Sequence, residues 1–521
     1  MRMGERDVPP HSNCFFIIRI GWKYVKYAPI ACFWKCTIFA CLDSWILVDM
    51  RLKNLTVEAI VHIITILNIS LMKNVKEVEM SFFRMNGVSV PHLKHTATMK
   101  AETMPVPSSV VIPMNMHIGA PAKPVVKVGD MVGVGQLIGE AAAFVSSPVY
   151  ASISGKVTKV DKIVGSNGAL ADAVFIESDG EMRPFEGIKP PKVTNFDEFI
   201  AAVRDSGIIG LGGAGFPTAV KRGVKDLSSI EEILINGAEC EPFITSDTRT
   251  MIDRAEDIKE GIELLEKYLG VKKIVFGIEK NKPEAIAKMQ EIAAGDSAVS
   301  VQVLPSQYPQ GGEKVLIYKL TGKVVPEGKL PLDVGCIVIN VTTLASIAAY
   351  IRTGMPLTSK CITVDGSAIA TPKNVIVPIG TRMKDVFAFV GEFKETPKKV
   401  IYGGPMMGIA VPSLEQPVLK NTNAIIAFGE KDAKRPEESP CIHCGNCVNS
   451  CPFGLNPIGF AKALALKDYE ALEALKVNVC MECGCCAYSC PAKRNIIARN
   501  KLAKAELRDY KQKQAEKEKE A

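Results

Sequence analysis

Nine of the 16 cysteines lie in two runs near the C-terminus, and the spacing of eight of them is typical of iron–sulfur ligation. The runs CIHCGNCVNSCP and CMECGCCAYSCP both read C-x2-C-x2-C-x3-C-P. In this pattern three cysteines of a run bind one [4Fe-4S] cluster and the fourth crosses to the other cluster. The sequence therefore predicts one cluster on Cys441, Cys444, Cys447 and Cys490, and a second on Cys480, Cys483, Cys486 and Cys451.

Zinc is the alternative metal for these cysteine runs. Zinc sites usually pair two short Cys-x-x-Cys elements for each ion, rather than running four cysteines into a proline. Such regular spacing also favours metal binding in a reducing compartment over disulfides. Cys485 is a further cysteine inside the second run, and the motif gives it no role.

A glycine-rich stretch, GLGGAGFPTAVK, is the second candidate for chemistry. Four of its residues are glycines: Gly210, Gly212, Gly213 and Gly215. They carry no side chain that would keep a flat or phosphorylated ligand from the backbone. The helix that follows would offer free N–H groups, and Lys221 would add a positive charge for a phosphate. A structural turn is the alternative, because the spacing is not that of the dinucleotide-binding fingerprint.

Alternating strands and helices must position this loop. Residues 195–355 contain amphipathic helical patterns at 196–207, 258–270 and 283–295, and short apolar strands at 231–237, 272–278 and 299–305. This alternation predicts a parallel, doubly wound, Rossmann-like sheet, which binds ligands beyond the carboxyl ends of its strands.

Four segments of this region resemble the flavin site of the NADH-oxidising subunit of respiratory complex I. They are GLGGAGFPTAVK, NGAECEP (236–242), YPQGGEK (308–314) and NVTTLASI (340–347). The resemblance implies an FMN lined by Gly210, Gly212, Gly213, Gly215, Lys221, Asn236, Glu239, Tyr308, Gly311 and Asn340, and NAD(H) facing Phe216, Glu241 and Glu313. Leu211 and Gly312 depart from that family's pattern, which has arginine and an acidic residue there.

Flanking modules complete a multidomain α/β organisation, as expected for 521 residues. Residues 105–190 resemble the barrel-sandwich of biotinyl and lipoyl carriers, but the hairpin tip carries Ala142, Ala143 and Phe144 instead of a carrier lysine. Residues 356–420 are similar to a β-grasp (SLBB-like) module. Residues 430–500 form the ferredoxin-like domain, with helical periodicity between the cysteine runs, and a charged tail covers 501–521.

The first 79 residues differ in composition from the rest and contain all three tryptophans. Three interpretations remain: a membrane anchor, an extra folded piece, or a non-native extension ahead of a true start at Met80. We favour the last, because charges interrupt the longest apolar stretch and no cleavage site follows it. Residues 80–104 are then an N-terminal arm.

The formal net charge of +7 is too small to indicate nucleic acid as a partner. From about residue 82 to 500, the order of modules and motifs resembles the RnfC subunits of the Rnf electron transport complexes. The resemblance implies a peripheral subunit on the cytoplasmic side of the cell membrane that passes electrons between NAD(H), FMN and two [4Fe-4S] clusters. It also implies other subunits of a membrane complex as partners, coupling to ferredoxin oxidation, and ion translocation. The alternatives are a microcompartment cobalamin reductase and a non-catalytic iron–sulfur relay scaffold.

Overall fold

The computed structural model describes residues 86–166, 168–221, 227–271 and 273–520, all of which belong to the unit Phe83–Ala521. The expectations for residues 1–79, and for the beginning of the arm, lie outside these residues. Among the described helices, none is both long enough and apolar enough to span a membrane.

Two small antiparallel sheets form the predicted barrel-sandwich module. One has the order β2 (Ser109–Pro113), β8 (Leu170–Ser178), β7 (Gly155–Val164), β4 (Met131–Val132). The other has the order β3 (Lys123–Pro124), β5 (Leu137–Glu140), β6 (Val149–Tyr150). Apolar side chains such as Ile112, Ile138 and Ile176 fill the interior. Phe144, at the tip between β5 and β6, is 70% exposed.

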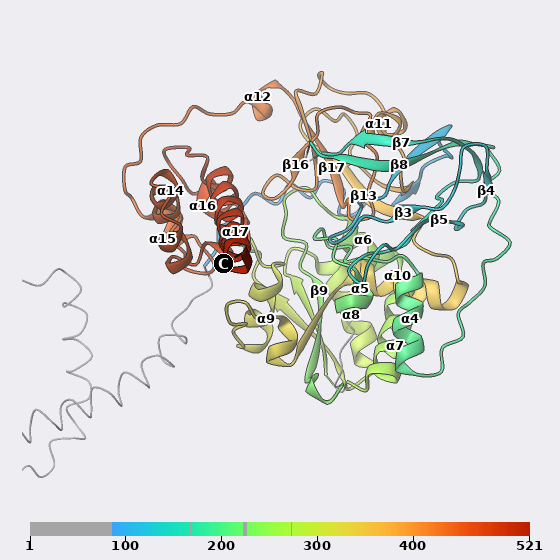
Figure 1. Ribbon diagram of the computed structural model, residues 1–521. Coiled ribbons are helices and arrows are strands. Elements are labelled where there is room, and N and C mark those ends of the chain that lie inside the picture. Colours follow the sequence, from blue (N-terminus) through green and yellow to red (C-terminus); the bar gives the residue numbers. More distant parts are fainter. Residues whose placement is uncertain (1–85, 167, 222–226, 272, 521) are drawn as a thin grey trace, which may run out of the picture. The chain divides into compact units, whose positions relative to one another are not determined.

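The predicted doubly wound sheet is confirmed. It has the order β11 (Val299–Leu304), β10 (Ile274–Glu279), β9 (Glu232–Gly237), β12 (Cys336–Asn340), and all its neighbours are parallel. The helices of this domain are α4 (Phe196–Asp205), α5 (Thr218–Lys221), α6 (Ser246–Asp253), α7 (Ala255–Leu269), α8 (Pro283–Ala294), α9 (Glu313–Thr321) and α10 (Val341–Thr353), with 3-10 turns at Leu227–Ser229 and Pro331–Val334. Figure 1 shows α4 and α7 next to one another, and the two helices contact each other.

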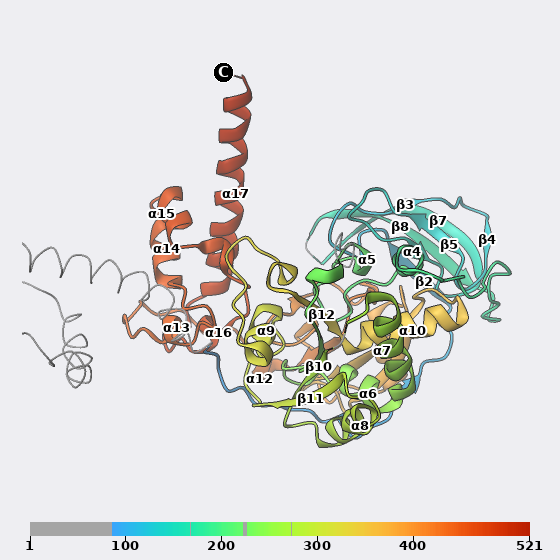
Figure 2. The same ribbon diagram turned by 90° about the horizontal axis from the view of Figure 1, so that it is seen from below.

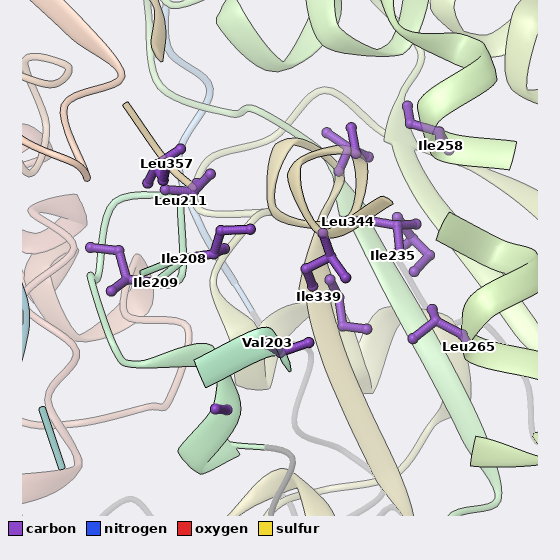
Figure 3. Packing of buried hydrophobic residues seen from close by; sticks show 14 of the residues in the cluster. Val203, Ile208, Ile209, Leu211, Ile235, Ile258, Leu265, Ile339, Leu344 and Leu357 are labelled. Atoms are coloured by element: carbon purple, nitrogen blue, oxygen red, sulfur yellow. The ribbon is translucent and has the colours of Figure 1, made fainter. Parts of the chain in front are cut away.

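The core of this domain lies between the sheet and its helices (Figure 3). Ile235 of β9 and Ile339 of β12 pack with Leu344 of α10 and with Ile258 and Leu265 of α7. The chain after α4 contributes Ile208, Ile209 and Leu211 to the same cluster, so the glycine-rich loop begins in the core.

A six-stranded sheet forms the β-grasp module. Its order is β1 (Glu102–Thr103), β14 (Lys373–Pro378), β13 (Ser359–Asp365), β17 (Ala424–Phe428), β15 (Lys399–Tyr402), β16 (Ile409–Ala410), and α11 (Met383–Val390) packs on it. The sheet extends past the predicted boundary at 420 because β17 is buried between β13 and β15. It also includes β1 from the arm, a strand too short to show any periodicity in the sequence.

Helices form the C-terminal domain: α12 (Glu430–Ala433), α13 (Asn446–Asn449), α14 (Pro457–Ala465), α15 (Tyr469–Ala474), a 3-10 turn at Val477–Val479, α16 (Cys485–Tyr488) and α17 (Ile496–Glu520). In Figure 2, α14 and α15 stand beside the long α17. Leu507 of α17 is buried with Phe460 and Leu472. The predicted tail from 501 onward is therefore a continuation of a helix that belongs to this domain.

Lys420 is a fully buried lysine where the barrel-sandwich module, the β-grasp module and the end of α4 meet. Its ammonium group donates to the carbonyls of Pro148 (2.5 Å) and Gly207 (2.8 Å) and to the Ser147 hydroxyl (3.3 Å). Burial lowers the pKa of Lys420 to about 7, against about 10.4 for an unfolded lysine. Between these two values the unfolded chain binds more protons, so the free energy of unfolding rises with pH.

We expect the Lys420→Met variant to lose this pH dependence. Between pH 7 and pH 9 the wild-type chain should gain about 2 kcal/mol of stability relative to the variant. Below pH 7 the difference should level off, because the lysine is then protonated in both states. Urea denaturation of both proteins across this range measures the effect. Parallel pH curves for the two proteins would contradict it.

Candidate functional site

The carboxyl ends of β9 and β12 lie side by side at the point where the order of strands reverses. Asn236 and Asn340, the polar residues at these ends, are register partners. In doubly wound sheets ligands bind at such a switch point, because neighbouring connections leave to opposite faces and open a crevice. The structure thus brings the second and fourth predicted segments together at the edge where a ligand is expected.

The glycine-rich loop reaches the same edge and is anchored by Leu211. The Leu211 side chain is 0% exposed, and burying a leucine contributes about 2 kcal/mol. Its amide donates to the Thr343 hydroxyl at the start of α10 (2.9 Å). Leu211, which departs from the complex I pattern, is therefore the hydrophobic anchor of the loop.

Beyond Leu211 the loop passes close to Asn340. A Cβ on Gly212 would lie 3.2 Å from the Asn340 side-chain nitrogen, so only a glycine fits without displacement. Gly213 and Gly215 have φ values of 116° and 69°, which side chains disfavour. Within the described residues, the amides of Gly212, Gly213 and Ala214 have no hydrogen-bond partner.

The other predicted residues of the first segment flank these amides. Gly210 closes the loop, since its amide donates to the Phe216 carbonyl (2.7 Å) and its carbonyl accepts from the Gly215 amide (3.2 Å). Phe216 is half-buried. Lys221 ends α5, and its side chain lies outside the described part of the structure.

The carbonyls of the second segment are bound by two lysines, of which Lys94 is half-buried and Lys282 is buried. Lys94 of the arm donates to the carbonyls of Glu239 (2.7 Å), Glu241 (2.8 Å) and Ile244 (2.5 Å). Lys282 donates to the Ala238 carbonyl (2.7 Å). Because these carbonyls are held by ammonium groups, the segment keeps one conformation, including the left-handed φ of 44° at Glu239.

The two glutamates of this segment bind protein groups rather than an open crevice. Glu239 accepts from the amides of Asp247 (2.6 Å) and Thr248 (3.3 Å) and so caps α6. Glu241, expected to face the nicotinamide nucleotide, accepts from the amides of Met406 (3.0 Å) and Met407 (2.8 Å). Burial raises the pKa of Glu241 to about 7, although both amide bonds oppose this rise.

The third segment closes against the second. The Asn236 side chain donates to the Gly311 carbonyl (2.9 Å), and the Gly311 amide donates to the Cys240 sulfur (3.3 Å). Glu313 is the first residue of α9. Asn340 caps α10 and also donates to Asp247 (2.7 Å). All four segments therefore meet at one edge of the sheet.

The Tyr308 side chain contacts the C-terminal domain. It is almost fully buried, and its hydroxyl donates to the Cys483 carbonyl (2.7 Å). Cys485, the extra cysteine of the second run, contacts the Tyr308 carbonyl through its sulfur (3.8 Å). The resemblance to the complex I subunit predicts that Tyr308 lines the flavin. In the structure, Tyr308 connects the third segment to the second cysteine run.

Two cavities divide the eight motif cysteines into the same two sets of four that the sequence predicts. The outer cavity, of about 80 Å³, is lined by Cys441, Cys444, Cys447 and Cys490. The inner cavity, of about 20 Å³, is lined by Cys451, Cys480, Cys483 and Cys486, together with Cys485. Each set therefore combines one run's first three cysteines with the other run's fourth. Among the described residues, no group of three or more His, Cys, Asp or Glu side chains is close enough together to hold a single metal ion.

The environment of the inner cavity suits thiolates that are already bound to iron. Burial raises the pKa of the Cys451, Cys480 and Cys486 thiols, whereas a hydrogen bond with Cys485 lowers the pKa of Cys483. The three thiols with a raised pKa therefore ionise when a metal binds rather than in its absence. The Asn500 side chain of α17 points an N–H at the Cys480 sulfur (3.6 Å). Hydrogen bonds of this kind tune cluster potentials. Four thiols around a buried cavity fit a [4Fe-4S] cluster.

Several supporting residues were missed by the sequence reasoning, among them Lys94, Lys282, Lys360, Asn421 and Asn423. A signal existed for Lys360, because it shares the buried face of β13 with Ile362 and Val364 at a spacing of two. A lysine in the core register of a strand must have a special partner. The others lie in segments without periodicity, and nothing in their surroundings distinguishes them.

Four family models match the chain. They are the RnfC Barrel sandwich hybrid domain (residues 83–181), the Nuo51 FMN-binding domain (203–349), the SLBB domain (361–410) and the 4Fe-4S dicluster domain (433–511). Their order along the chain is the order of modules that the sequence predicts.

Curated relatives cover most of the chain. The C subunit of a proton-translocating ferredoxin:NAD(+) oxidoreductase complex from Clostridium ljungdahlii is 43% identical over 70% of this chain and 80% of its own. The corresponding subunit of a Na(+)-translocating ferredoxin:NAD(+) oxidoreductase complex from Acetobacterium woodii is 41% identical over 81% and 96%. The corresponding subunit of an ion-translocating oxidoreductase complex from Rhodobacter capsulatus is 38% identical over 75% and 76%.

Proposed function

This chain belongs to the RnfC family, the C subunits of the ion-translocating ferredoxin:NAD(+) oxidoreductase (Rnf) complexes, and from that premise we propose that it is the point at which NAD(H) exchanges electrons with such a complex. It is an oxidoreductase subunit with FMN and [4Fe-4S] clusters as cofactors. When bound, the flavin and the clusters supply the conversion between a two-electron hydride and single electrons.

One observation carries the proposal: the third flavin segment and the inner cysteine cavity share a packed contact. Tyr308 donates to the Cys483 carbonyl. Met481 lies so close to Gly312 that a Cβ at position 312 would be 2.5 Å from its terminal methyl. Electron transfer needs a short path through packed atoms, and this contact supplies one between the flavin edge and the inner cavity.

The outer cavity is the more exposed of the two. Cys444 is exposed and Ile442, between two of its cysteines, is 67% exposed, whereas Cys483, Cys485 and Cys486 are buried. We therefore propose the order NAD(H) site, inner cavity, outer cavity, neighbouring subunit. Because electron transfer to another protein needs an accessible redox group, the exposed cavity suits the last position.

The residues of the chain would bind and orient the cofactors and exclude water. We propose that FMN and NAD(H) are held by Gly210, Gly212, Gly213, Gly215, Phe216, Lys221, Asn236, Gly311, Glu313 and Asn340, with Glu239, Glu241 and Tyr308 shaping the segments around them. The amides of Gly212, Gly213 and Ala214 are donors for acceptor atoms of the flavin nucleotide. The eight motif cysteines would hold the clusters as two crossed sets of four.

The chain is one subunit of a multi-subunit complex, as its relatives' names state. We propose that the other subunits are embedded in the cell membrane, that this one lies on their cytoplasmic side, and that electrons reach it indirectly from ferredoxin. The names of the relatives, which join ferredoxin:NAD(+) oxidoreduction to translocation of protons or sodium ions, support this proposal.

Anaerobic reconstitution of the full chain tests the function. We expect about one FMN and about eight iron atoms per chain, and bleaching of the flavin absorbance when NADH is added. Iron without flavin would reject the NAD(H) site and leave an iron–sulfur relay. Flavin that NADH fails to reduce would reject the role as the point of electron exchange with NAD(H).

A further inference from the structure

The glycine-rich loop is held on one side by residues of the β-grasp module. Lys360 of β13 is 4% exposed and donates from its ammonium group to the Leu211 carbonyl (2.8 Å). Asn421, just before β17, donates from its side-chain amide to the Gly213 carbonyl (3.0 Å). Both contacts cross more than a hundred residues of sequence, so they join two modules rather than stabilising a local turn.

These contacts fix the direction of the loop's amides as well as its carbonyls. A peptide unit is planar and trans, so its C=O and N–H point in opposite directions. When Lys360 holds the Leu211 carbonyl, the Gly212 amide must point away from the β-grasp module. When Asn421 holds the Gly213 carbonyl, the Ala214 amide does the same. Gly212 and Ala214 are two of the residues whose amides have no partner among the described residues.

The barrel-sandwich module applies the same constraint at the end of the loop. The Ile118 amide donates to the Gly215 carbonyl (2.9 Å), which turns the Phe216 amide in the opposite direction. The carbonyls of alternate residues 211, 213 and 215 are thus all bound from outside the loop. Glycines have wide conformational freedom, and without these contacts the loop would sample many other backbone conformations.

The positive charge of Lys360 adds to its geometric effect. Its ammonium group has the Asn423 side-chain oxygen as a second acceptor (2.5 Å). Burial lowers the pKa of Lys360 to about 8, and the nearby Asp247 carboxylate opposes this fall by favouring the charged form. An ammonium donor polarises the peptide unit it binds, which makes the N–H on the other side a stronger donor. A methionine side chain, which has similar length but no donor and no charge, could supply neither effect.

We propose that Lys360 and Asn421 are positioning residues of the flavin site: by holding the Leu211 and Gly213 carbonyls, they present the Gly212 and Ala214 amides to acceptor atoms of FMN. The β-grasp module is then part of the flavin site instead of a separate packing or partner module. This inference rests on the proposed function, because it takes FMN as the ligand of the loop.

The test compares three variants of the full chain by FMN titration, followed as flavin fluorescence quenching. We expect Lys360→Met to raise the Kd for FMN at least tenfold and Lys360→Arg, which keeps charge and donors, to recover part of the loss. The matched control is Tyr402→Phe, which removes a buried hydrogen bond to the Pro417 carbonyl (2.6 Å) in the same module without touching the loop. Its Kd should stay within about twofold of the wild type.

Hydrogen exchange of the flavin-free proteins gives a second measurement that does not depend on the ligand. The amides of residues 212–216 should exchange faster in Lys360→Met than in the wild type and in Tyr402→Phe. Unchanged exchange together with an unchanged Kd would overturn the positioning role. If Tyr402→Phe weakens FMN as much as Lys360→Met does, the role is also overturned. A wild type that binds no FMN would instead reject the proposed function, and the exchange comparison would still decide how the loop is held.

Discussion

Replacing Cys490 by serine should remove the cluster that the first cysteine run binds, although Cys490 lies in the second run. Cys490 lines the outer cavity with Cys441, Cys444 and Cys447. Iron should fall from about eight to about four atoms per chain. The remaining spectrum should match that of Cys444→Ser and differ from that of Cys480→Ser. Anaerobic iron quantitation with electron paramagnetic resonance of the reduced proteins measures both effects.

Two further serine variants make this test specific. Cys451→Ser should give the spectrum of Cys480→Ser, because both side chains line the inner cavity. Cys485→Ser is the control within the same run. Its sulfur contacts the Tyr308 carbonyl and the motif gives it no ligand role, so its iron content should stay at the wild-type level. If Cys490→Ser instead grouped with Cys480→Ser, each run would hold its own cluster and the crossed assignment would be wrong.

Replacing Gly213 by valine should abolish most FMN binding while leaving the clusters in place. A β-branched residue at a φ of 116° is strained, by about 1–3 kcal/mol. The loop can relieve that strain only by moving its carbonyls from their partners, which would turn the neighbouring amides away from the ligand. We expect the Kd for FMN to rise by about ten- to a hundredfold, with iron content unchanged.

Gly391→Val is the matched control for backbone strain. Gly391 also has a φ of 116° and open space around its Cβ position, but it ends α11 in the β-grasp module. The Gly391→Val variant should lose a similar amount of stability, while its affinity for FMN should stay near that of the wild type. Equal loss of FMN in both variants would mean that general destabilisation, and not the shape of the loop, controls binding.

The sequence was informative where a periodic pattern or a motif stood for a physical requirement. The alternation of helices and strands over 195–355 predicts the parallel sheet because buried strands and amphipathic helices have different periods. Asn236 and Asn340 were predicted for the site from the resemblance to the complex I subunit, and they are register partners at the edge of this sheet. The two cysteine runs predict the two sets of cavity residues because a cluster needs four thiolates in a fixed arrangement.

No such pattern predicts the contacts that shape the site. Lys282 and Lys360 are buried and Lys94 is half-buried, whereas lysine in a sequence indicates an exposed surface. Glu239 and Glu241 were expected on the ligand, but their carboxylates accept from backbone amides, those of Asp247 in the next helix and of the distant Met406. Such partners depend on tertiary packing, in particular on the left-handed backbone at Glu239, for which a non-glycine residue gives no sequence signal.

The crossed lining of the two cavities also constrains how the protein is made. Between the runs, residues 452–479 form α14 and α15, and each cavity needs cysteines from both sides of this segment. Neither cavity can close before the ribosome has passed the second run. Iron insertion therefore joins distant parts of the chain, as a disulfide would, and couples maturation of the whole domain to metal supply. In iron-starved cells, we expect proteases to degrade this domain as a unit. The chain should then be lost and should not accumulate with a single cluster.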